Sequence, residues 1–293
     1  MPTQLHDQTC VITGASRGIG RVIAGRLAAG GARLVLCSRS QAELERTAAD
    51  IVERYGVEVR TEPTDVTDLG ALSELASSVE RRGPTSTLIN CAAVLGPVGR
   101  IDQVDQERWR HALTTNLGGT AAACAAFVPQ MIAGGGGSIV NLSGGGIGGP
   151  NLPGRISAYT ASKAGVAALT ESLGEELAPH GIRINAVAPG PVGTGFMREV
   201  LDAGPEGAGA DLYRSTVRQQ DVTEPSEQLL DLVEFIVSPE SSPLTGKLLS
   251  ARWDDLDSLR AHVADLSRSS TYNLRRIDGT LFSEADTGSG SSP

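Results

Sequence analysis

The stretch TCVITGASRGIGRVIAGRLAA at residues 9–29 indicates how the chain folds. A short apolar run comes first, a glycine-containing turn follows it, and apolar residues at helical spacing come last, which predicts a strand, a turn and a helix. Such a turn lets the backbone approach the pyrophosphate of a dinucleotide, and the N-terminus of the helix favours its negative charge. A plain strand-to-helix turn is the alternative. The predicted cofactor contacts at this turn are Gly14, Ser16, Arg17, Gly18, Ile19 and Gly20.

The same alternation of short apolar runs and longer helix-period segments continues to about residue 251. It predicts further strands at residues 32–37, 57–60, 86–90, 137–143, 183–188 and 246–251, and helices at residues 19–29, 41–55, 68–82, 106–132, 159–179, 226–237 and 256–266. The fold class is therefore α/β, a doubly wound parallel sheet of the Rossmann type. We expect a single domain over residues 8–251, a C-terminal extension over residues 252–286 and a disordered tail over residues 287–293. The glycine-rich residues 204–209 are expected to be mobile.

Composition argues against several classes of protein. The 293 residues carry a net charge of -9 without a dense basic cluster, so no nucleic-acid partner is expected. No apolar run approaches the roughly 20 residues that span a bilayer, and the first residues lack a signal-peptide pattern. We therefore expect a cytoplasmic protein that acts on a small molecule and does not bind a membrane. The four cysteines lack CxxC spacing and the four histidines are isolated, so we expect reduced thiols and no metal site.

The end of the second predicted strand bears on the choice between NAD and NADP. An acidic residue at this position would hold the adenosine ribose hydroxyls and repel a 2′-phosphate, but the sequence here is CSRS at residues 37–40. Arg39 can pair with a phosphate, Ser38 can donate a hydrogen bond to it, and Arg17 adds a second cation. The sequence thus favours NADP over NAD. The alternative, in which Arg39 only caps a strand in solvent, does not restore the missing carboxylate.

Two further segments fit the same cofactor groove. Asp65 and Val66 follow the third predicted strand, where a side chain can reach the adenine amino group, and Asn90 ends the fourth strand. Each signal is weak by itself. We include all three residues among the predicted cofactor contacts.

Tyr159 and Lys163 in the segment SAYTASKAG are the candidate acid–base pair. Four residues apart on a helix, they lie on one face, a turn apart. Tyrosine has a pKa of about 10, and a nearby ammonium together with the positive nicotinamide favours the phenolate that a general base requires. YxxxK also arises by chance on helices. Here, however, it follows a Gly-rich loop at the expected carboxyl end of the fifth strand, beside the nicotinamide.

Five segments together resemble the short-chain dehydrogenase/reductase family: TGASRGIG, NCAA, TTNLGG, YTASK, and the Pro189–Gly190 pair with Thr194. The resemblance covers about residues 8–251. It implies that Tyr159 gives or takes the proton and that Lys163 binds the nicotinamide ribose and lowers the tyrosine pKa.

The same resemblance implies cofactor and relay roles for other residues. Asn116 would hold a water molecule in the proton relay, while Thr194 and the backbone at Val192 would hold the nicotinamide carboxamide. Pro189 and Gly190 belong to the same cofactor-binding segment. The stretch CSRSQAEL at residues 37–44 is similar to NADP-using members of the family.

The end of the fifth strand departs from the family pattern. Members commonly have N-x-S-S there, whereas this chain has Asn-Leu-Ser-Gly-Gly at residues 141–145, which places Gly144 at the usual position of the catalytic serine. The loop before Tyr159 is about two residues longer than the norm. Ser143 is the candidate replacement hydroxyl, and its alternative role is to cap the strand end.

Together these features predict reversible hydride transfer between NADP(H) and a carbonyl or secondary alcohol on a small or polar substrate. Two alternatives remain: an NADP(H)-binding regulatory or structural protein with little catalysis, and an epimerase that oxidises its substrate transiently. Small apolar residues on more than one face of the predicted helices at residues 106–132 and 159–179 favour a homodimer or homotetramer.

Overall fold

The computed structural model describes residues 5–144, 146–148, 152–193, 195–222 and 224–274. Its centre is a sheet of seven parallel strands in the order β3-β2-β1-β4-β5-β6-β7. The chain thus runs outward from β1 in one direction and from β4 in the other, which confirms the doubly wound class. The strands are β1 Thr9–Thr13, β2 Arg33–Ser38, β3 Val59–Pro63, β4 Thr87–Asn90, β5 Gly137–Leu142, β6 Ile182–Ala188 and β7 Leu248–Ser250.

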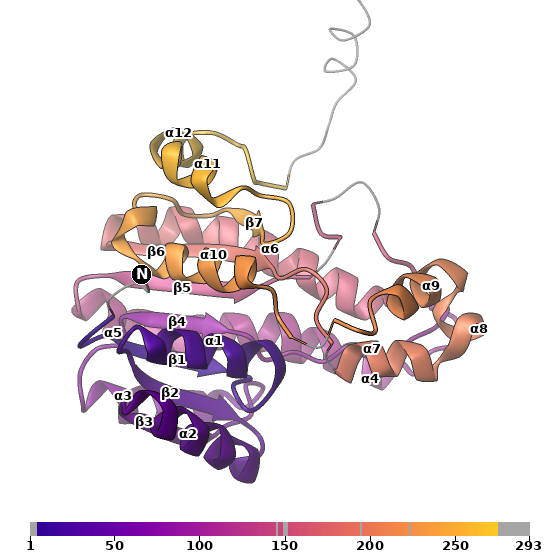
Figure 1. Cartoon of the computed structure of the whole chain (residues 1–293), viewed down its shortest axis with the longest axis horizontal. Coiled ribbons are helices and arrows are strands. Elements are labelled where there is room, and N and C mark those ends of the chain that lie inside the picture. Colours follow the sequence, from indigo (N-terminus) through magenta and orange to yellow (C-terminus); the bar gives the residue numbers. More distant parts are fainter. Residues whose placement is uncertain (1–4, 145, 149–151, 194, 223, 275–293) are drawn as a thin grey trace, which may run out of the picture.

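Helices cover both faces of the sheet (Figure 1). One face packs against α1 Gly18–Ala29, α2 Gln41–Tyr55 and α10 Glu227–Val237. The other packs against α3 Leu69–Glu80, α5 Gly119–Ala133 and α6 Ser157–Leu177, while α4 Gln106–Leu113 packs mainly on α6. Two short 3₁₀ helices, η2 Ala178–His180 and η3 Pro239–Ser241, complete these connections.

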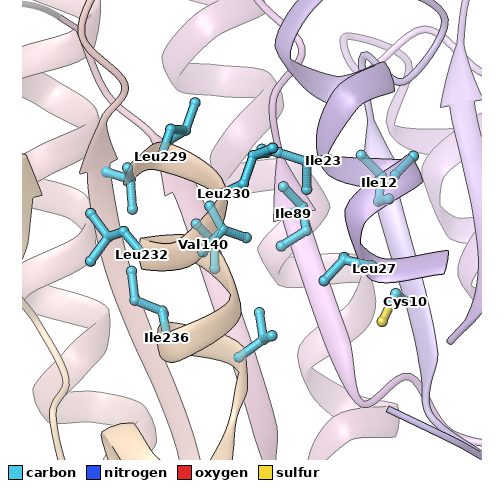
Figure 2. Packing of buried hydrophobic residues seen from close by; sticks show 14 of the residues in the cluster. Cys10, Ile12, Ile23, Leu27, Ile89, Val140, Leu229, Leu230, Leu232 and Ile236 are labelled. Atoms are coloured by element: carbon cyan, nitrogen blue, oxygen red, sulfur yellow. The ribbon is translucent and has the colours of Figure 1, made fainter. Parts of the chain in front are cut away.

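The alternation of side chains along the strands creates the two cores. In β1, Cys10 and Ile12 belong to the core beneath α1 and α10, whereas Val11 belongs to the opposite core. Figure 2 shows the first core, in which side chains of α1 and α10 surround Ile89 and Val140 of the central strands. Burial on both faces explains why the strands are nearly continuous apolar runs.

Two predicted elements differ from the structure. The helix predicted over residues 106–132 is interrupted by a π-helical turn, η1 Thr114–Gly118, between α4 and α5. Residues 204–209, for which the sequence predicts a mobile stretch, lie in a region of short helices, namely α7 Gly195–Asp202, α8 Gly204–Ala208 and α9 Ala210–Arg218. Gly204 and Gly209 have positive φ angles of 65° and 77°, and they separate consecutive helices. The mobility of this stretch stays a prediction.

The described part of the C-terminal extension packs on the main domain. It forms α11 Leu256–Ala261 and α12 Val263–Arg268, which divide the single helix predicted over residues 256–266, and it contributes Leu259 and Val263 to the first core. The backbone of Tyr272 accepts a hydrogen bond of 2.8 Å from Leu248 at the edge of β7. The chain is therefore one domain, and its boundaries at residues 8 and 251 stay a prediction. The tail predicted over residues 287–293 lies outside the described residues.

No helix within the described residues combines the length and the apolar character that crossing a membrane requires.

Candidate active site

The turn after β1 forms a close-fitting cradle of backbone. A Cβ atom on Gly14, whose φ is 67°, would lie 2.7 Å from the nitrogen of Ala92, and one on Gly20 would lie 2.4 Å from the oxygen of Gly14. The hydroxyl of Thr13 accepts hydrogen bonds from the backbone nitrogens of Cys91 and Ala92, which joins this turn to the end of β4. Side chains at these two positions would collide with backbone atoms, so the glycines let the turn, the start of α1 and the end of β4 pack this closely.

The N-terminus of α1 completes the cradle. Its N-cap, Arg17, makes no side-chain capping hydrogen bond, so the first amides of a 12-residue helix are available for an anion. Gly18 has a φ of 54°, and Ile19 lies half-buried beside it. These residues, together with Gly14 and Gly20, fit the pyrophosphate of a nicotinamide dinucleotide.

The end of β2 carries charges of both signs. Arg39 and Arg17 are exposed, and neither forms an ion pair with another described residue. The hydroxyl of Ser38 accepts a hydrogen bond of 3.3 Å from the nitrogen of Ser40. The hydroxyl of Ser16, however, donates to the carboxylate of Glu43 at 3.0 Å. This carboxylate, which the sequence analysis missed, opposes the two cations at the site predicted for a 2′-phosphate.

Asp65 and Val66 lie at the end of β3, as predicted. The Asp65 carboxylate accepts hydrogen bonds from the backbone nitrogen and the hydroxyl of Thr67, at 2.9 and 2.8 Å. Burial favours its protonated form, but these hydrogen bonds and the charge of Arg39 hold its pKa below the usual value. Val66 is buried against Gly119, where a Cβ would approach it to 2.5 Å.

Asn90 serves mainly to join strands. Its side-chain nitrogen donates to Asn141 of β5 at 2.9 Å, and Asn141 donates in turn to Thr170 of α6 at 2.9 Å. The Asn90 oxygen is buried and has no hydrogen-bond partner among the described residues. A cofactor contact from Asn90 stays a prediction.

Tyr159 and Lys163 stand in the first two turns of α6, beside the end of β5. The Lys163 ammonium donates a 2.6 Å hydrogen bond to the carbonyl oxygen of Leu142 and lies 5.9 Å from the centroid of the Tyr159 ring. Lys163 is buried and Tyr159 is partly exposed, with its ring edge-on to Phe196 of α7 at a centroid distance of 5.5 Å. The helix therefore brings the predicted pair together.

Burial shifts the pKa values of this pair. It raises the pKa of Tyr159 above its ordinary value and lowers the pKa of Lys163 to about 8. The expected lowering of the tyrosine pKa by Lys163 is thus not seen in the chain alone, because desolvation of the phenolate, together with the negative charge of a Cys91 thiolate, raises this pKa. The phenol is a proton donor at neutral pH, and its use as a base depends on further positive charge.

Asn116 lies in the π-helical turn η1 and is fully buried. Its side chain accepts a hydrogen bond from the nitrogen of Val94 at 2.8 Å and donates to the carbonyl oxygen of Val94 and to the hydroxyl of Ser162, each at 2.9 Å. Ser162 donates in turn to the backbone oxygen of Tyr159 at 2.8 Å. Asn116 is a positioning residue in this structure, and the water-holding role stays a prediction that only its backbone could fulfil.

The hydroxyl of Ser143 does not take part in this pair. It is buried and donates to the backbone oxygen of Lys163 at 3.1 Å, so it joins the end of β5 to α6. At Gly144 a Cβ would lie 3.0 Å from Cε1 of Tyr159 and 3.1 Å from Cγ of Lys163. The functional-hydroxyl role of Ser143 stays a prediction, and this geometry does not support it.

The loop after β6 and the helix α7 close the site on its other side. Pro189, Gly190 and Val192 follow β6, with Gly190 at a φ of 77° and Val192 buried. Thr194 lies outside the described residues. The contact between Phe196 and Tyr159 could not be predicted, because no local pattern in the sequence shows that α7 folds back onto α6.

One thiol also belongs to this site. The thiol of Cys91 lies at this site, and burial raises its pKa to about 11, although the charge of Lys163 acts in the opposite direction. Within the described ranges, no three side chains of the types His, Cys, Asp and Glu gather as potential metal ligands.

A cradle for a dinucleotide and a tyrosine–lysine pair at the carboxyl edge of one sheet define a nicotinamide-dependent oxidoreductase. The model of the family described as "short chain dehydrogenase" matches residues 8–204. The chain belongs to this family and is an NAD(P)-dependent dehydrogenase or reductase.

Individual relatives show the range of the family. The chain is 35% identical over 252 residues to galactitol 2-dehydrogenase (L-tagatose-forming) of Cereibacter sphaeroides, covering 84% of this chain and 94% of the relative. It is 32% identical over 248 residues to 2,3-dihydro-2,3-dihydroxybenzoate dehydrogenase of Bacillus subtilis, covering 82% and 93%. The structure of NAD+-bound xylitol dehydrogenase superposes with a TM-score of 0.77 at 29% identity, covering 85% and 98%.

Proposed function

We propose that this enzyme interconverts a secondary alcohol and a carbonyl on a small polar substrate, with NADP(H) as the hydride partner and Tyr159 as the proton donor and acceptor. The observation that carries the proposal is the placement of Tyr159 and Lys163 beside the backbone cradle at the carboxyl edge of the sheet. Relatives named for galactitol and xylitol support a polyol or sugar as the substrate.

The chain's own residues can transfer the hydroxyl proton of the alcohol and hold Tyr159 in position for this transfer. In the oxidation direction, a bound nicotinamide cofactor would supply the acceptor for the hydride of the alcohol carbon. The phenolate oxygen of Tyr159 takes the hydroxyl proton, so that the carbonyl forms with charge and electrons balanced. Lys163, held by Leu142, keeps a positive charge near the phenol, and Asn116 fixes the backbone of the first turn of α6 through Ser162.

The exchange of Tyr159 for Phe tests this role. Tyr159→Phe should lower kcat by at least about a hundredfold, since a positioned acid or base contributes roughly 10²–10⁴-fold, and should leave cofactor binding intact. Turnover is measured with a panel of polyols and sugars, and binding by fluorescence titration of NADPH. Tyr55→Phe, at an exposed site on α2, is the matched control. Normal turnover by Tyr159→Phe would sink the mechanism.

The preference for NADP rests on the two cations at the end of β2. Arg39 and Arg17 favour a 2′-phosphate, whereas Glu43 opposes it. Direct titration with both cofactors decides between them, and NADP should bind more tightly, with a salt dependence that NAD lacks. The structurally similar xylitol dehydrogenase contains NAD+, so the fold by itself does not require NADP.

A protein that binds NADP(H) with little catalysis is the second candidate, favoured by the lack of space for a hydroxyl at Gly144. Tight cofactor binding without turnover on any carbonyl would support it, and robust NADPH oxidation would exclude it. We also expect a homodimer or homotetramer through α5 and α6, which sedimentation of the purified protein measures.

A further inference from the structure

The C-terminal extension returns along the outer edge of the sheet. β7 stands at the end of the sheet and pairs with β6. The extension leaves β7 at Arg252, whose guanidinium lies 4.6 Å from the centroid of the Trp253 ring, and it forms α11 and α12 beside this edge (Figure 1). The backbone oxygen of Tyr272 then accepts a hydrogen bond of 2.8 Å from the nitrogen of Leu248 in β7. The extension therefore covers backbone groups that an edge strand otherwise presents to solvent.

A buried lysine fixes the last described residues of this extension. The Lys247 ammonium donates hydrogen bonds to the backbone oxygen of Ser269 at 2.5 Å and to the side-chain oxygen of Asn273 at 2.8 Å. The side-chain nitrogen of Asn273 donates in turn to the backbone oxygen of Gly246 at 2.9 Å. Lys247 is only 3% exposed, so the loss of either acceptor would leave its charge less well satisfied. Residues 269–274, which we call the C-terminal strap, are therefore anchored to β7.

The C-terminal strap brings Leu274 to the loop that follows β5. A Cβ on Gly148, whose φ is 80°, would lie 3.8 Å from Cδ2 of Leu274 and 3.2 Å from Cδ2 of Leu248. The neighbouring Ile147 is buried, and its backbone nitrogen donates to the oxygen of Gly144 at 3.4 Å. Side chains of β7 and of the strap thus lie directly against this loop.

The same loop contacts the acid–base pair at its beginning. A Cβ on Gly144 would lie 3.0 Å from Cε1 of Tyr159 and 3.1 Å from Cγ of Lys163. Close contacts and one hydrogen bond therefore connect Leu274 with the phenol, through Gly148 and the first residues of the loop. Because Gly144 stands against the ring of Tyr159, the position of the loop limits where this ring can lie.

We propose that the C-terminal strap is a positioning element for the reaction, in which Leu274 holds the loop after β5 against Tyr159 and so keeps the phenol in its reacting position. Leu274 and Asn273 are positioning residues, since they act on the phenol through the loop. The proposal rests on the proposed function, because it assigns a support to the proton donor of that reaction. The alternative is a strap that only covers the edge of β7.

Two matched truncations separate these roles. Leu274→Ala removes the contact with the loop, whereas Leu266→Ala shortens another half-buried leucine of the extension, one that packs on the first core from α12. Titration with NADPH counts the competent sites, so that unfolded protein does not enter the rate. Per site, kcat of Leu274→Ala should fall roughly tenfold to hundredfold, because displacing reacting groups by about 1 Å costs up to about 10²-fold. Leu266→Ala should keep the kcat of the wild type.

Two further variants sharpen this comparison. Leu274→Met, which nearly conserves the volume of the side chain, should restore most of the rate. Asn273→Ala, which releases the strap from Gly246 and Lys247, should lower kcat as Leu274→Ala does. In both Leu274→Ala and Asn273→Ala the KM of the substrate should change less than kcat, and the Kd of NADPH should stay that of the wild type, because the backbone cradle after β1 is unchanged.

Hydrogen exchange followed by mass spectrometry tests the strap without turnover. Peptides that contain Ile147 should exchange several-fold faster in Leu274→Ala and Asn273→Ala than in the wild type and Leu266→Ala, because the loop loses its support. Equal exchange in all four proteins, or an equal kcat per site in Leu274→Ala and Leu266→Ala, would overturn the positioning role. Absence of turnover by the wild type on every compound would overturn the oxidoreductase function instead, and the exchange rates would then decide the role of the strap alone.

Discussion

Gly144 leaves little room for a side chain, because a Cβ there would lie 3.0 Å from Cε1 of Tyr159 and 3.1 Å from Cγ of Lys163. A family pattern read from sequence assigns a serine to this position, and the structure gives a physical reason for the glycine. The helix α6 approaches the end of β5 closely enough for Lys163 to reach the carbonyl oxygen of Leu142. Adding a hydroxymethyl group would separate the two elements that position the phenol.

We therefore predict that Gly144→Ser impairs the enzyme instead of improving it. Overpacking of this kind costs about 1–3 kcal/mol, and the displaced Tyr159 should lower kcat/KM as well. Urea unfolding and steady-state kinetics measure the two effects. Gly154→Ser is the control, since a Cβ there meets no atom within 4 Å. A more active and equally stable Gly144→Ser protein would show that α6 can move away at little cost.

At the scale of elements, α1 and α10 are joined by a charged cluster on their shared side of the sheet. Arg26 of α1 pairs with Glu227, Asp231 and Glu234 of α10, and of these Glu234 is only 8% exposed. Because the glycine-rich turn leads directly into α1, this cluster also holds the helix whose N-terminus faces the cofactor. Loss of this cluster should thus weaken the positioning of α1 at the cofactor site and also lower the stability of the fold.

Replacing Arg26 by Gln should lower the free energy of unfolding by roughly 2–3 kcal/mol, because Glu234 would remain buried without its cation. Urea denaturation followed by circular dichroism measures the change. Arg21→Gln is the matched control: Arg21 stands on the same helix, but its pair with Asp50 is about half exposed on both sides and should contribute less than about 1 kcal/mol. Similar losses in the two variants would contradict this explanation.

Regular elements could be predicted from local pattern, and irregular ones could not. The predicted bounds of the helix at residues 41–55 agree with α2, where Ser40 caps the first turn and Gly56 ends the last. The π-helical turn at Asn116 was missed, since it depends on contacts with Val94 and Ser162, which are distant in sequence. The helices α7 to α9 were missed for the same reason: their apolar residues pack on Tyr159, Leu95 and Ile156.

At the scale of the molecule, the site is the meeting place of segments that a doubly wound sheet brings to one edge. The sequence could predict this edge, because parallel strands end there, and with it Tyr159, Lys163 and the glycine turn. It could not show that Glu43 reaches Ser16, that Ser143 turns to the backbone of α6, or that Leu274 reaches the loop at Gly148. Each of these depends on side-chain directions across elements.

Buried thiols make the whole domain sensitive to alkali. Burial raises the pKa of Cys10 and of Cys124 to about 12, and that of Cys37 further, from an ordinary value of 9.0. The folded state then keeps thiol protons that the unfolded chain releases. The contribution of these protonated thiols to the free energy of unfolding is therefore complete below pH 9 and is lost as the pH rises toward 12. Lys163 acts oppositely between about pH 8 and 10.5, because its folded pKa is lowered, but it is one group against these three thiols and Cys91, whose pKa is also raised.

The free energy of unfolding should therefore fall above pH 9.5 by at least about 1.4 kcal/mol for each pH unit. Urea midpoints at pH 7.5, 9.5 and 10.5 measure this slope. Cys10→Ala should be less stable at pH 7.5 but should show a slope smaller by about one proton. A slope that is unaffected by this substitution would mean that other groups carry the alkaline transition.

The stacking of Arg252 on Trp253 gives the protein an intrinsic optical reporter. The chain has only two tryptophans: Trp253, 76% exposed and stacked under Arg252 just after β7, and Trp109, whose indole nitrogen donates to Ser157 at the start of α6. A change that draws Arg252 away from its ring alters the emission of Trp253, whereas events at the first turn of α6 alter that of Trp109. Changes at these two places can accordingly be followed separately by fluorescence in single-tryptophan variants, with no added dye.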